Sequence, residues 1–347
     1  MKTRHSFANL QAIRAIAAVQ VMVFHTPFWR PHFLSQTPWG VDLFFVLPGF
    51  IISYSAGTSL SLFIVKRISR LVPMYWLMTF ITFIASALLP SFFKNTRPIL
   101  SHLFLSLGFI PFHKSEKIMA PVLHVGWTIN YEFFFYVIFG FAMYLSLRNP
   151  RWIALITIVF LVILGIKFGS ISDILNFYCN PLIIEFALGI LIYEIWRRQN
   201  DGRLPNIPMI AWTLIGSGAL CIIVFAPLSR DPWIQLVDHG LPSFLIVLSG
   251  VELDQYVRCP RFIRTIGDAS YSLYLIHYHI LMLPLTLIAP EKKLTPLTFV
   301  VSLIVWILIV QISILIYRYI EKPIIEFTRK FLMYYVLREN ISDRSYV

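Results

Sequence analysis

The hydrophobic positions of this chain gather in long runs, and short polar stretches separate one run from the next. Ten runs approach the roughly 20 residues that a helix needs to cross a bilayer. We expect spanning helices at about 8–28, 40–56, 71–90, 126–147, 152–169, 174–196, 207–227, 234–251, 268–288 and 296–320. The pattern predicts an all-α fold, a polytopic helical bundle that is integral to a membrane.

One further apolar run, residues 98–112, is shorter than the others and has prolines at its two ends. We expect an interfacial or re-entrant segment on the outer face, because the run is too short for a comfortable span. Counting it as an eleventh span would invert the orientation of everything that follows.

Charge is scarce and unevenly placed. Only 13% of the 347 residues are charged, against about 25% in soluble domains. If the N-terminus is cytoplasmic and the spans alternate, 20 of the 29 Lys and Arg residues fall on the cytoplasmic side. Cytoplasmic loops carry such an excess, so we expect both termini in the cytoplasm and no nucleic-acid partner. The three cysteines are too few and too scattered for a disulfide framework or a metal site.

No internal repeat divides the chain. We therefore expect one membrane domain over residues 1–325 and a short cytoplasmic tail over 326–347. The first apolar run lacks the small-residue cleavage pattern of a signal peptide, so we expect it to remain as an anchor.

The first apolar run carries two ionisable side chains, Arg14 and His25. On an α-helix their spacing brings them within about 20° of one another, about 16 Å apart along the axis. Arg14 would lie at the cytoplasmic edge and His25 towards the outer face. Arg14 could simply extend to the interface and His25 could be a hydrogen-bonded interfacial histidine, but ionisable groups inside a membrane are rare and usually functional.

Further polar groups belong to the same part of the bundle. Glu132 stands among phenylalanines in the stretch HVGWTINYEFFFY, where a carboxylate needs a partner, and His25 at matching depth is a candidate. Asp42 opens the second helix, where it could equally complement the helix dipole. The connecting stretch KRISR, residues 66–70, could hold phosphates or could be ordinary cytoplasmic charge.

Three other features have a functional and a structural interpretation. Pro48 and Gly49 predict a kink or a close backbone approach in the second helix. Tyr271, Tyr274 and Tyr278 form a stripe that favours helix packing, whereas His277 beside them is a better functional candidate. Trp127 fits an aromatic belt at the membrane interface, and Glu185 could pair with a neighbouring helix.

Several of these motifs together resemble one family. LQAIRAIAAVQVMVFH is similar to the opening helix of the acyltransferase family 3 membrane proteins, in which Arg and His recur at this spacing. GVDLFFVLPGFIIS, FIVKRISRLVPMYW, WTINYEFFFY, IGDASYSLYLIHYHI and YIEKP resemble the later blocks, in the same order. Pro48 departs from the Ser or Gly that the family commonly has at that position.

The resemblance implies an enzyme that moves an acyl group, usually acetyl, from cytoplasmic acyl-coenzyme A to a hydroxyl of an envelope polysaccharide or glycolipid. It implies a location in the bacterial inner membrane, a donor that is a substrate and not a bound cofactor, and, if a periplasmic partner is needed, a separate protein. By the family pattern Arg67 and Arg70 meet the coenzyme, together with Arg14 and Lys66. Trp127, Tyr136, Tyr271 and His277 are our candidates for substrate binding.

Acyl transfer to a hydroxyl needs a base and stabilisation of an oxyanion. We expect His25 to be the base, oriented by Glu132 or Asp42. A route in which His25 itself carries the acyl group is an alternative.

Three other functions remain open from the sequence. A transporter or flippase of a glycan or acyl intermediate could use Arg14, Glu132, Glu185 and His277 as a path. Another membrane acyltransferase family would have a lipid or protein acceptor. A sensor would only bind acyl-coenzyme A.

Overall fold

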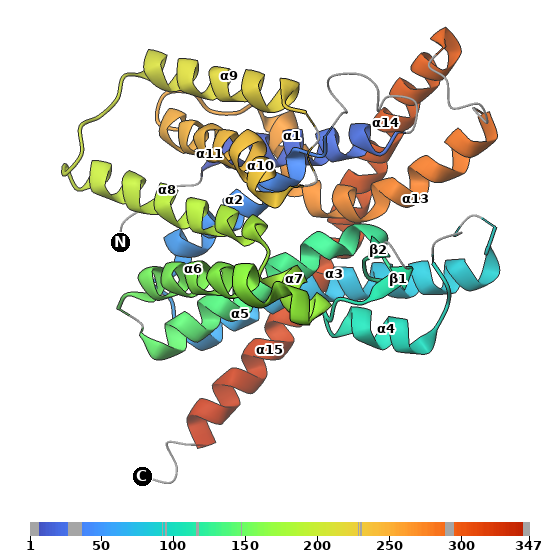
Figure 1. The fold of residues 1–347 in the computed structure, drawn as a ribbon, viewed down its shortest axis with the longest axis horizontal. Helices are drawn as coiled ribbons and strands as arrows, with labels where there is room; N and C mark the ends of the chain where they lie inside the picture. Colours follow the sequence, from blue (N-terminus) through green and yellow to red (C-terminus); the bar gives the residue numbers. More distant parts are fainter. Residues whose placement is uncertain are drawn as a thin grey trace.

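The computed structural model describes residues 7–26, 37–91, 93, 96–115, 118–146, 148–227, 229, 231–288 and 295–342. Within them the chain is almost entirely helical (Figure 1), as the hydrophobic pattern predicted. The α-helices are α1 (Ala8–Phe24), α2 (Gly40–Ser55), α3 (Leu60–Leu88), α4 (Leu100–Leu107), α5 (Trp127–Leu145), α6 (Pro150–Phe168), α7 (Asp173–Tyr178), α8 (Ile184–Asn200), α9 (Met209–Phe225), α10 (Pro232–Gln235), α11 (Leu241–Leu253), α12 (Arg261–Asp268), α13 (Ser270–Ile288), α14 (Pro296–Ile316) and α15 (Lys322–Ser342).

Short helical turns extend several of these helices: η2 (His124–Gly126), η3 (Gly169–Ile171), η4 (Pro181–Ile183), η5 (Leu236–Gly240) and η6 (Tyr317–Glu321). The strands within the described ranges are β1 (His113–Ser115) and β2 (Ile118–Met119), which pair in antiparallel fashion. They form a small ribbon between α4 and α5.

Six helical segments in the described part of the chain are long and apolar enough to cross a membrane: Leu60–Leu88, His124–Leu145, Pro150–Ile171, Asp173–Asn200, Pro232–Leu253 and Pro296–Tyr335. Helices α1, α2 and α9 are apolar but shorter. Large side chains are exposed along the outside of the bundle, for example Ile156 at 65% and Phe225 at 70%. Exposed apolar side chains in this number suit contact with lipid.

The prediction placed KRISR in a connection, and this was wrong. Helix α3 begins at Leu60, and Ser59 caps it by accepting a hydrogen bond from the backbone N–H of Leu62 at 3.3 Å. The basic residues therefore lie on the first turns of α3, because Lys and Arg are good helix formers and Ser59 supplies the start signal.

The segment 98–112 forms α4, which has eight residues and ends at a turn where Phe109 has a φ of 56°. A helix of that length is about 12 Å long, too short to span.

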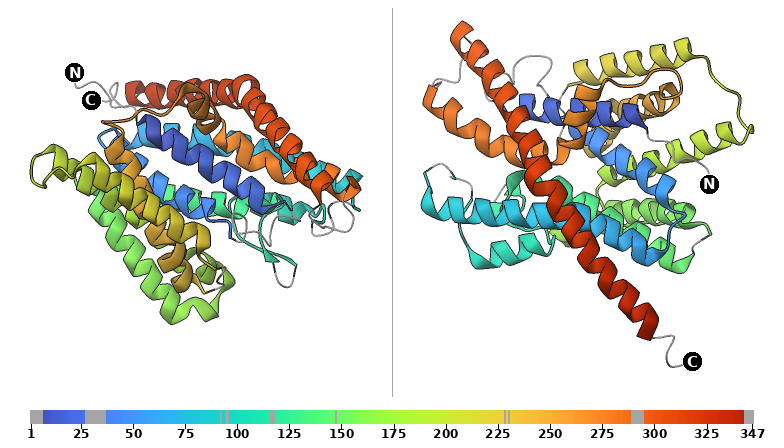
Figure 2. Two further views of the ribbon diagram at one scale, coloured as in Figure 1. Left: turned by 90° about the horizontal axis from the view of Figure 1, so that it is seen from above. Right: turned by 180° about the vertical axis from the view of Figure 1, so that it is seen from behind.

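The last helix extends beyond its predicted end at about residue 320. Helix α14 continues through the π-helical turn η6 into α15, so the segment 326–342 of the predicted cytoplasmic tail is helical. Seen from behind, α14 and α15 line up in one diagonal across the bundle that projects beyond it, whereas the view from above shows a bend between them (Figure 2). Helix α15 packs against α3.

Helices α2 and α8 cross in direct backbone contact. A Cβ atom on Gly49 would lie 2.2 Å from the carbonyl oxygen of Phe186, and one on Gly189 would lie 2.1 Å from that of Val46. The close approach predicted at Pro48 and Gly49 is thus confirmed, although α2 stays helical from Gly40 to Ser55. Only residues without a side chain permit this distance.

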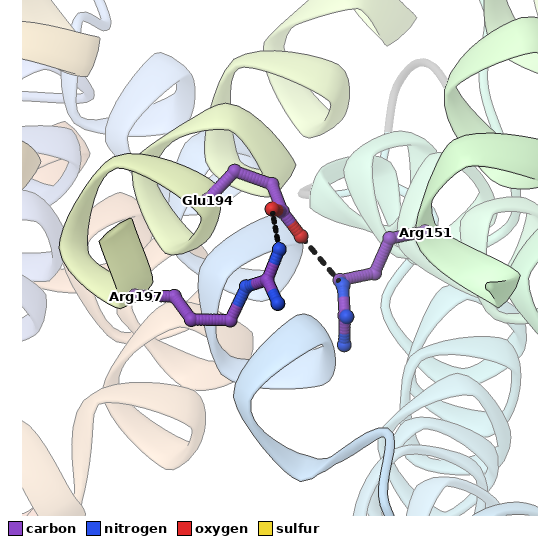
Figure 3. A network of polar contacts seen from close by, with 3 residues as sticks. All are labelled: Arg151, Glu194 and Arg197. Atoms are coloured by element: carbon purple, nitrogen blue, oxygen red, sulfur yellow. Dashed lines mark hydrogen bonds and ion pairs between the residues drawn. The ribbon is translucent and has the colours of Figure 1, made fainter. Parts of the chain in front are cut away.

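An ion-pair network joins α6 to the far end of α8 (Figure 3). Glu194 is buried, and its carboxylate accepts a hydrogen bond from Nε of Arg151 at 2.8 Å and one from Arg197 at 2.7 Å. The two arginines compensate for the cost of burying the carboxylate, so the network fixes the ends of the two helices.

Candidate active site

A cavity opens among α1, α2, α3, α5 and α13. Its polar lining includes Arg14, Arg67, Arg70, Thr128, Glu132, Tyr136, Ser270, Tyr271 and Tyr274. Apolar residues of α2, among them Phe44, Phe45 and Pro48, form much of the remainder.

Three arginines from two helices face this cavity. Arg67 and Arg70 are three residues apart, so they share one face of α3, and both line the cavity, whereas Lys66 is not among the described lining residues. Arg67 donates a hydrogen bond to Oγ of Ser55 at 2.8 Å, and its guanidinium lies 5.8 Å from the ring centre of Tyr136. Arg14 is 8% exposed. The result is a partly fixed group of cations that suits phosphate oxygens.

Acidic groups balance part of this charge. Tyr136, one turn after Glu132 on α5, donates a hydrogen bond to the Glu132 carboxylate. Glu132 and Glu321 both lie near enough to Arg14 to interact with it electrostatically. Glu321 is buried in η6 and accepts a hydrogen bond from the hydroxyl of Ser272. The sequence does not reveal this contact, because Ser272 lies 49 residues away from Glu321.

A histidine pair lies outside this lining. His25 caps the C-terminal end of α1, and its Nδ1 lies 2.8 Å from the carbonyl oxygen of Val21 and 3.2 Å from Nε2 of His277. The ring centres of the two histidines are 4.9 Å apart. His277 is fully buried, and its Nδ1 lies 3.2 Å from the carbonyl oxygen of Leu273.

Tyr274 lies between the cavity and the histidine pair. It lines the cavity, and its ring centre is 5.8 Å from that of His277. Its hydroxyl hydrogen-bonds to Oγ1 of Thr128 at 2.8 Å and donates to the carbonyl oxygen of Val125 at 3.2 Å. The sequence indicated only packing for Tyr274, since a stripe of tyrosines does not reveal what lies on either side of it.

Of the other predicted residues, Tyr271 lines the cavity, whereas Trp127 and Asp42 are not among its described lining residues. Tyr271 donates a hydrogen bond to the carbonyl oxygen of Leu71 at 2.7 Å. Trp127 packs edge-on against Phe45 with ring centres 6.2 Å apart. Asp42 is buried beside Glu185 of α8 and accepts a hydrogen bond from Gln235 at 3.1 Å.

The arrangement separates two kinds of chemistry. Cations gather with Glu132 around the cavity, and imidazoles gather behind Tyr274. Among the described residues, no three His, Cys, Asp or Glu side chains are grouped as a metal ion would require.

A family model for an acyltransferase domain, acyltransferase 3, matches residues 7–318. The chain is 32% identical to the exopolysaccharide production protein ExoZ of Rhizobium meliloti over 263 residues, which cover 74% of this chain and 80% of ExoZ. It is 26% identical to YrhL of Bacillus subtilis and 24% identical to the peptidoglycan O-acetyltransferase OatA of Listeria monocytogenes. In both cases 93% of this chain matches 56% of the relative, so the chain spans little more than half their length.

No solved structure matches this chain. The family match confirms the resemblance that the motifs indicated, because it covers almost all of the described membrane helices and agrees with the similarity to ExoZ. With its apolar helices, the chain is a multi-pass membrane protein and an acyltransferase, and it belongs to the acyltransferase 3 family.

Proposed function

We propose that this acyltransferase moves an acetyl group from acetyl-coenzyme A to a hydroxyl of a cell-envelope polysaccharide or glycolipid. It would do so in the cytoplasmic membrane through ten spanning helices, with both termini in the cytoplasm. The observation that carries the proposal is the cavity with Arg14, Arg67 and Arg70, which lies one tyrosine ring away from a histidine pair. The names of ExoZ and OatA support a polysaccharide acceptor and O-acetyl transfer.

The arginines serve the donor. Coenzyme A carries phosphates at one end and the thioester at the other, so phosphates held by Arg67 and Arg70 leave the thioester arm to extend along the cavity. Arg14 belongs to the same helix as His25, and about 16 Å separates the two along the axis. An extended arm that reaches past Tyr274 would bring the thioester carbonyl towards His25.

His25 serves the acceptor. In the proposed reaction its imidazole removes the proton of the sugar hydroxyl while that oxygen attacks the thioester carbonyl. The C–S bond then breaks, the acetyl group stays on the sugar oxygen, and the proton passes from His25 to the coenzyme A thiolate. Glu132, which the sequence offered as the partner of His25, is instead bonded by Tyr136 at the cavity and is better placed to balance the arginines.

Substitution of His25 tests the proposal. We expect His25→Ala to abolish release of free coenzyme A from acetyl-coenzyme A when the acceptor polysaccharide is added, because no other group would take the hydroxyl proton. The enzyme would be purified in detergent and free thiol measured with a chromogenic reagent. A transporter or a sensor would release no coenzyme A even as the unaltered chain, so the same assay separates these functions.

The matched control is His113→Ala. His113 lies on β1 with 48% of its side chain exposed, pairs with Asp173, and is not among the described lining residues of the cavity. We expect this variant to keep the rate of the unaltered chain. Normal turnover in the purified His25→Ala enzyme would contradict the proposed role of His25.

A further inference from the structure

We infer that His277 is a positioning residue that holds His25 in the tautomer needed for proton abstraction. The inference rests on the proposed function, because it concerns the base of that reaction. The sequence indicated a role in substrate binding for His277, and we infer instead that His277 contacts and orients another side chain of the protein, His25. Its basis is the set of short contacts that surround the two imidazoles.

The hydrogen-bond partners of His277 fix its own tautomer. Nδ1 of His277 lies 3.2 Å from the carbonyl oxygen of Leu273, and a carbonyl oxygen can only accept. The proton of a neutral His277 is therefore on Nδ1, and Nε2 carries the lone pair. That lone pair points at Nδ1 of His25, 3.2 Å away.

The same reasoning then fixes His25. Its Nδ1 faces two acceptors, the carbonyl oxygen of Val21 at 2.8 Å and Nε2 of His277 at 3.2 Å. A neutral His25 satisfies both only when Nδ1 carries the proton, which leaves the lone pair on Nε2. Nε2 is then the nitrogen that can accept the proton of a hydroxyl group. The second histidine thus takes the place of the carboxylate in a Ser-His-Asp triad.

Proton transfer balances without any change in His277. The hydroxyl proton forms a bond to Nε2 of His25, and the resulting imidazolium continues to donate from Nδ1 to His277. The proton on Nε2 then leaves with the coenzyme A thiolate. A neutral imidazole stabilises the cation less than a carboxylate would, and in return no buried negative charge has to be maintained at this position.

The surroundings of His277 hold its ring in place as the partner of His25. It is fully buried on α13, held from one side by Leu273 and from the other by His25, and the ring of Tyr274 lies beside it. His279, two residues along the same helix, points to a different neighbour and contacts Oγ1 of Thr82 on α3 at 3.1 Å. The two histidines therefore differ in partner although they are close in sequence.

The substitutions His277→Gln and His277→Asn distinguish a role of His277 in orienting His25 from a role in helix packing, because both introduce an amide of similar polarity. In His277→Gln the amide oxygen can reach the place of Nε2 and accept from His25, whereas in His277→Asn the amide reaches only the place of Nδ1 and bonds Leu273. We expect His277→Gln to keep kcat within about 10-fold and His277→Asn to lower it roughly 100-fold. The KM for acetyl-coenzyme A should change less than about twofold in both, because the donor site lies on the other side of Tyr274.

The pH profile gives a readout that packing alone would not move. Without its acceptor, His25 holds a proton less firmly, so the acidic limb of the rate profile should move to lower pH in His277→Asn and stay in place in His277→Gln. The titratable groups next to the pair are Tyr274, Tyr278 and His279, and His124 and Lys114 lie beyond them. Burial lowers the pKa of Lys114 to about 8, so the acidic limb is the one to compare.

The control is His279→Gln, which we expect to leave kcat and the acidic limb unchanged. Equal rates in the Gln and Asn variants of His277, or an unmoved acidic limb in the Asn variant, would overturn the inference. Loss of activity in His25→Ala together with full activity in His277→Asn would remove His277 alone. Full activity in His25→Ala would instead remove the proposed base itself.

Discussion

Neighbouring side chains on one turn of helix have different surroundings in this protein, and Lys66 and Arg67 are the clearest case. The sequence grouped them as one basic stretch. The structure places Arg67 and Arg70 at the cavity, with Arg67 bonded to Ser55, whereas Lys66 is not among the described lining residues. Helical phase alone could not have predicted this difference, because on the helix Lys66 lies about 40° from Arg70 and Arg67 lies about 60° from it.

Arg67 should contribute to donor affinity through its charge and through its planar group. We expect Arg67→Ala to weaken binding of acetyl-coenzyme A about 10-fold, the loss typical of a hydrogen bond to a charged group. Arg67→Lys should recover only part of it, because an ammonium keeps the charge and loses the paired donors. Isothermal titration on the purified protein measures both.

Arg203→Ala is the matched control, since Arg203 is an exposed arginine outside the cavity lining. We expect its affinity to equal that of the unaltered chain. If Arg67→Ala binds acetyl-coenzyme A as tightly as Arg203→Ala does, the cavity arginines do not hold the donor.

At the level of single residues, the sequence identified candidate site residues but could not identify the side chains that they contact. Arg14 and His25 could be placed on one face of one helix because a single helix has a known period. Which residue meets His25 depends on the neighbouring helix, and the contact with His277 joins positions 252 residues apart. Periodicity carries no information about that separation.

Between elements, the closest contact is the crossing of α2 and α8. We expect Gly189→Ala to lower the free energy of unfolding by about 3 kcal/mol, because the new methyl group would lie 2.1 Å from the carbonyl oxygen of Val46 and push the helices apart. Thermal unfolding in detergent, followed by circular dichroism, measures the loss.

Gly218→Ala on α9 controls for the substitution itself. No atom lies within 4 Å of the position that its Cβ would occupy, so we expect equal or slightly higher stability, given that Ala favours helix over Gly. Equal melting temperatures for the two variants would show that α2 and α8 do not depend on this contact.

Element boundaries were predicted unevenly. Apolar runs located the helices well because burial and lipid contact both select apolar residues. The beginning of α3 was missed by eleven residues, because the charged stretch KRISR interrupts its apolar run and was taken for the boundary of the span. The end of the last helix was missed for a similar reason: α15 is polar on part of its surface and continues α14 without a break.

For the whole molecule, the remaining prediction is its orientation. We expect Arg203→Cys to react with a membrane-impermeant maleimide only after cells are permeabilised, and Ser172→Cys to react in intact cells. Both positions are exposed, and they lie at opposite ends of the helical segment Asp173–Asn200. The exposed Cys221 would first be replaced by Ser. The opposite labelling pattern would invert the proposed topology.

In the proposed orientation, the position of the Tyr274 ring bears on proton leakage across the membrane. A water-filled path from the arginine cavity to the histidine pair would carry protons and dissipate the gradient that the cell maintains. Tyr274, bonded to Thr128 and packed against Phe44 with ring centres 5.7 Å apart, lies where it would close such a path. In the proposed reaction the acyl group would then have to pass this ring without opening a continuous water path, and the proton gradient would limit how wide the passage can become.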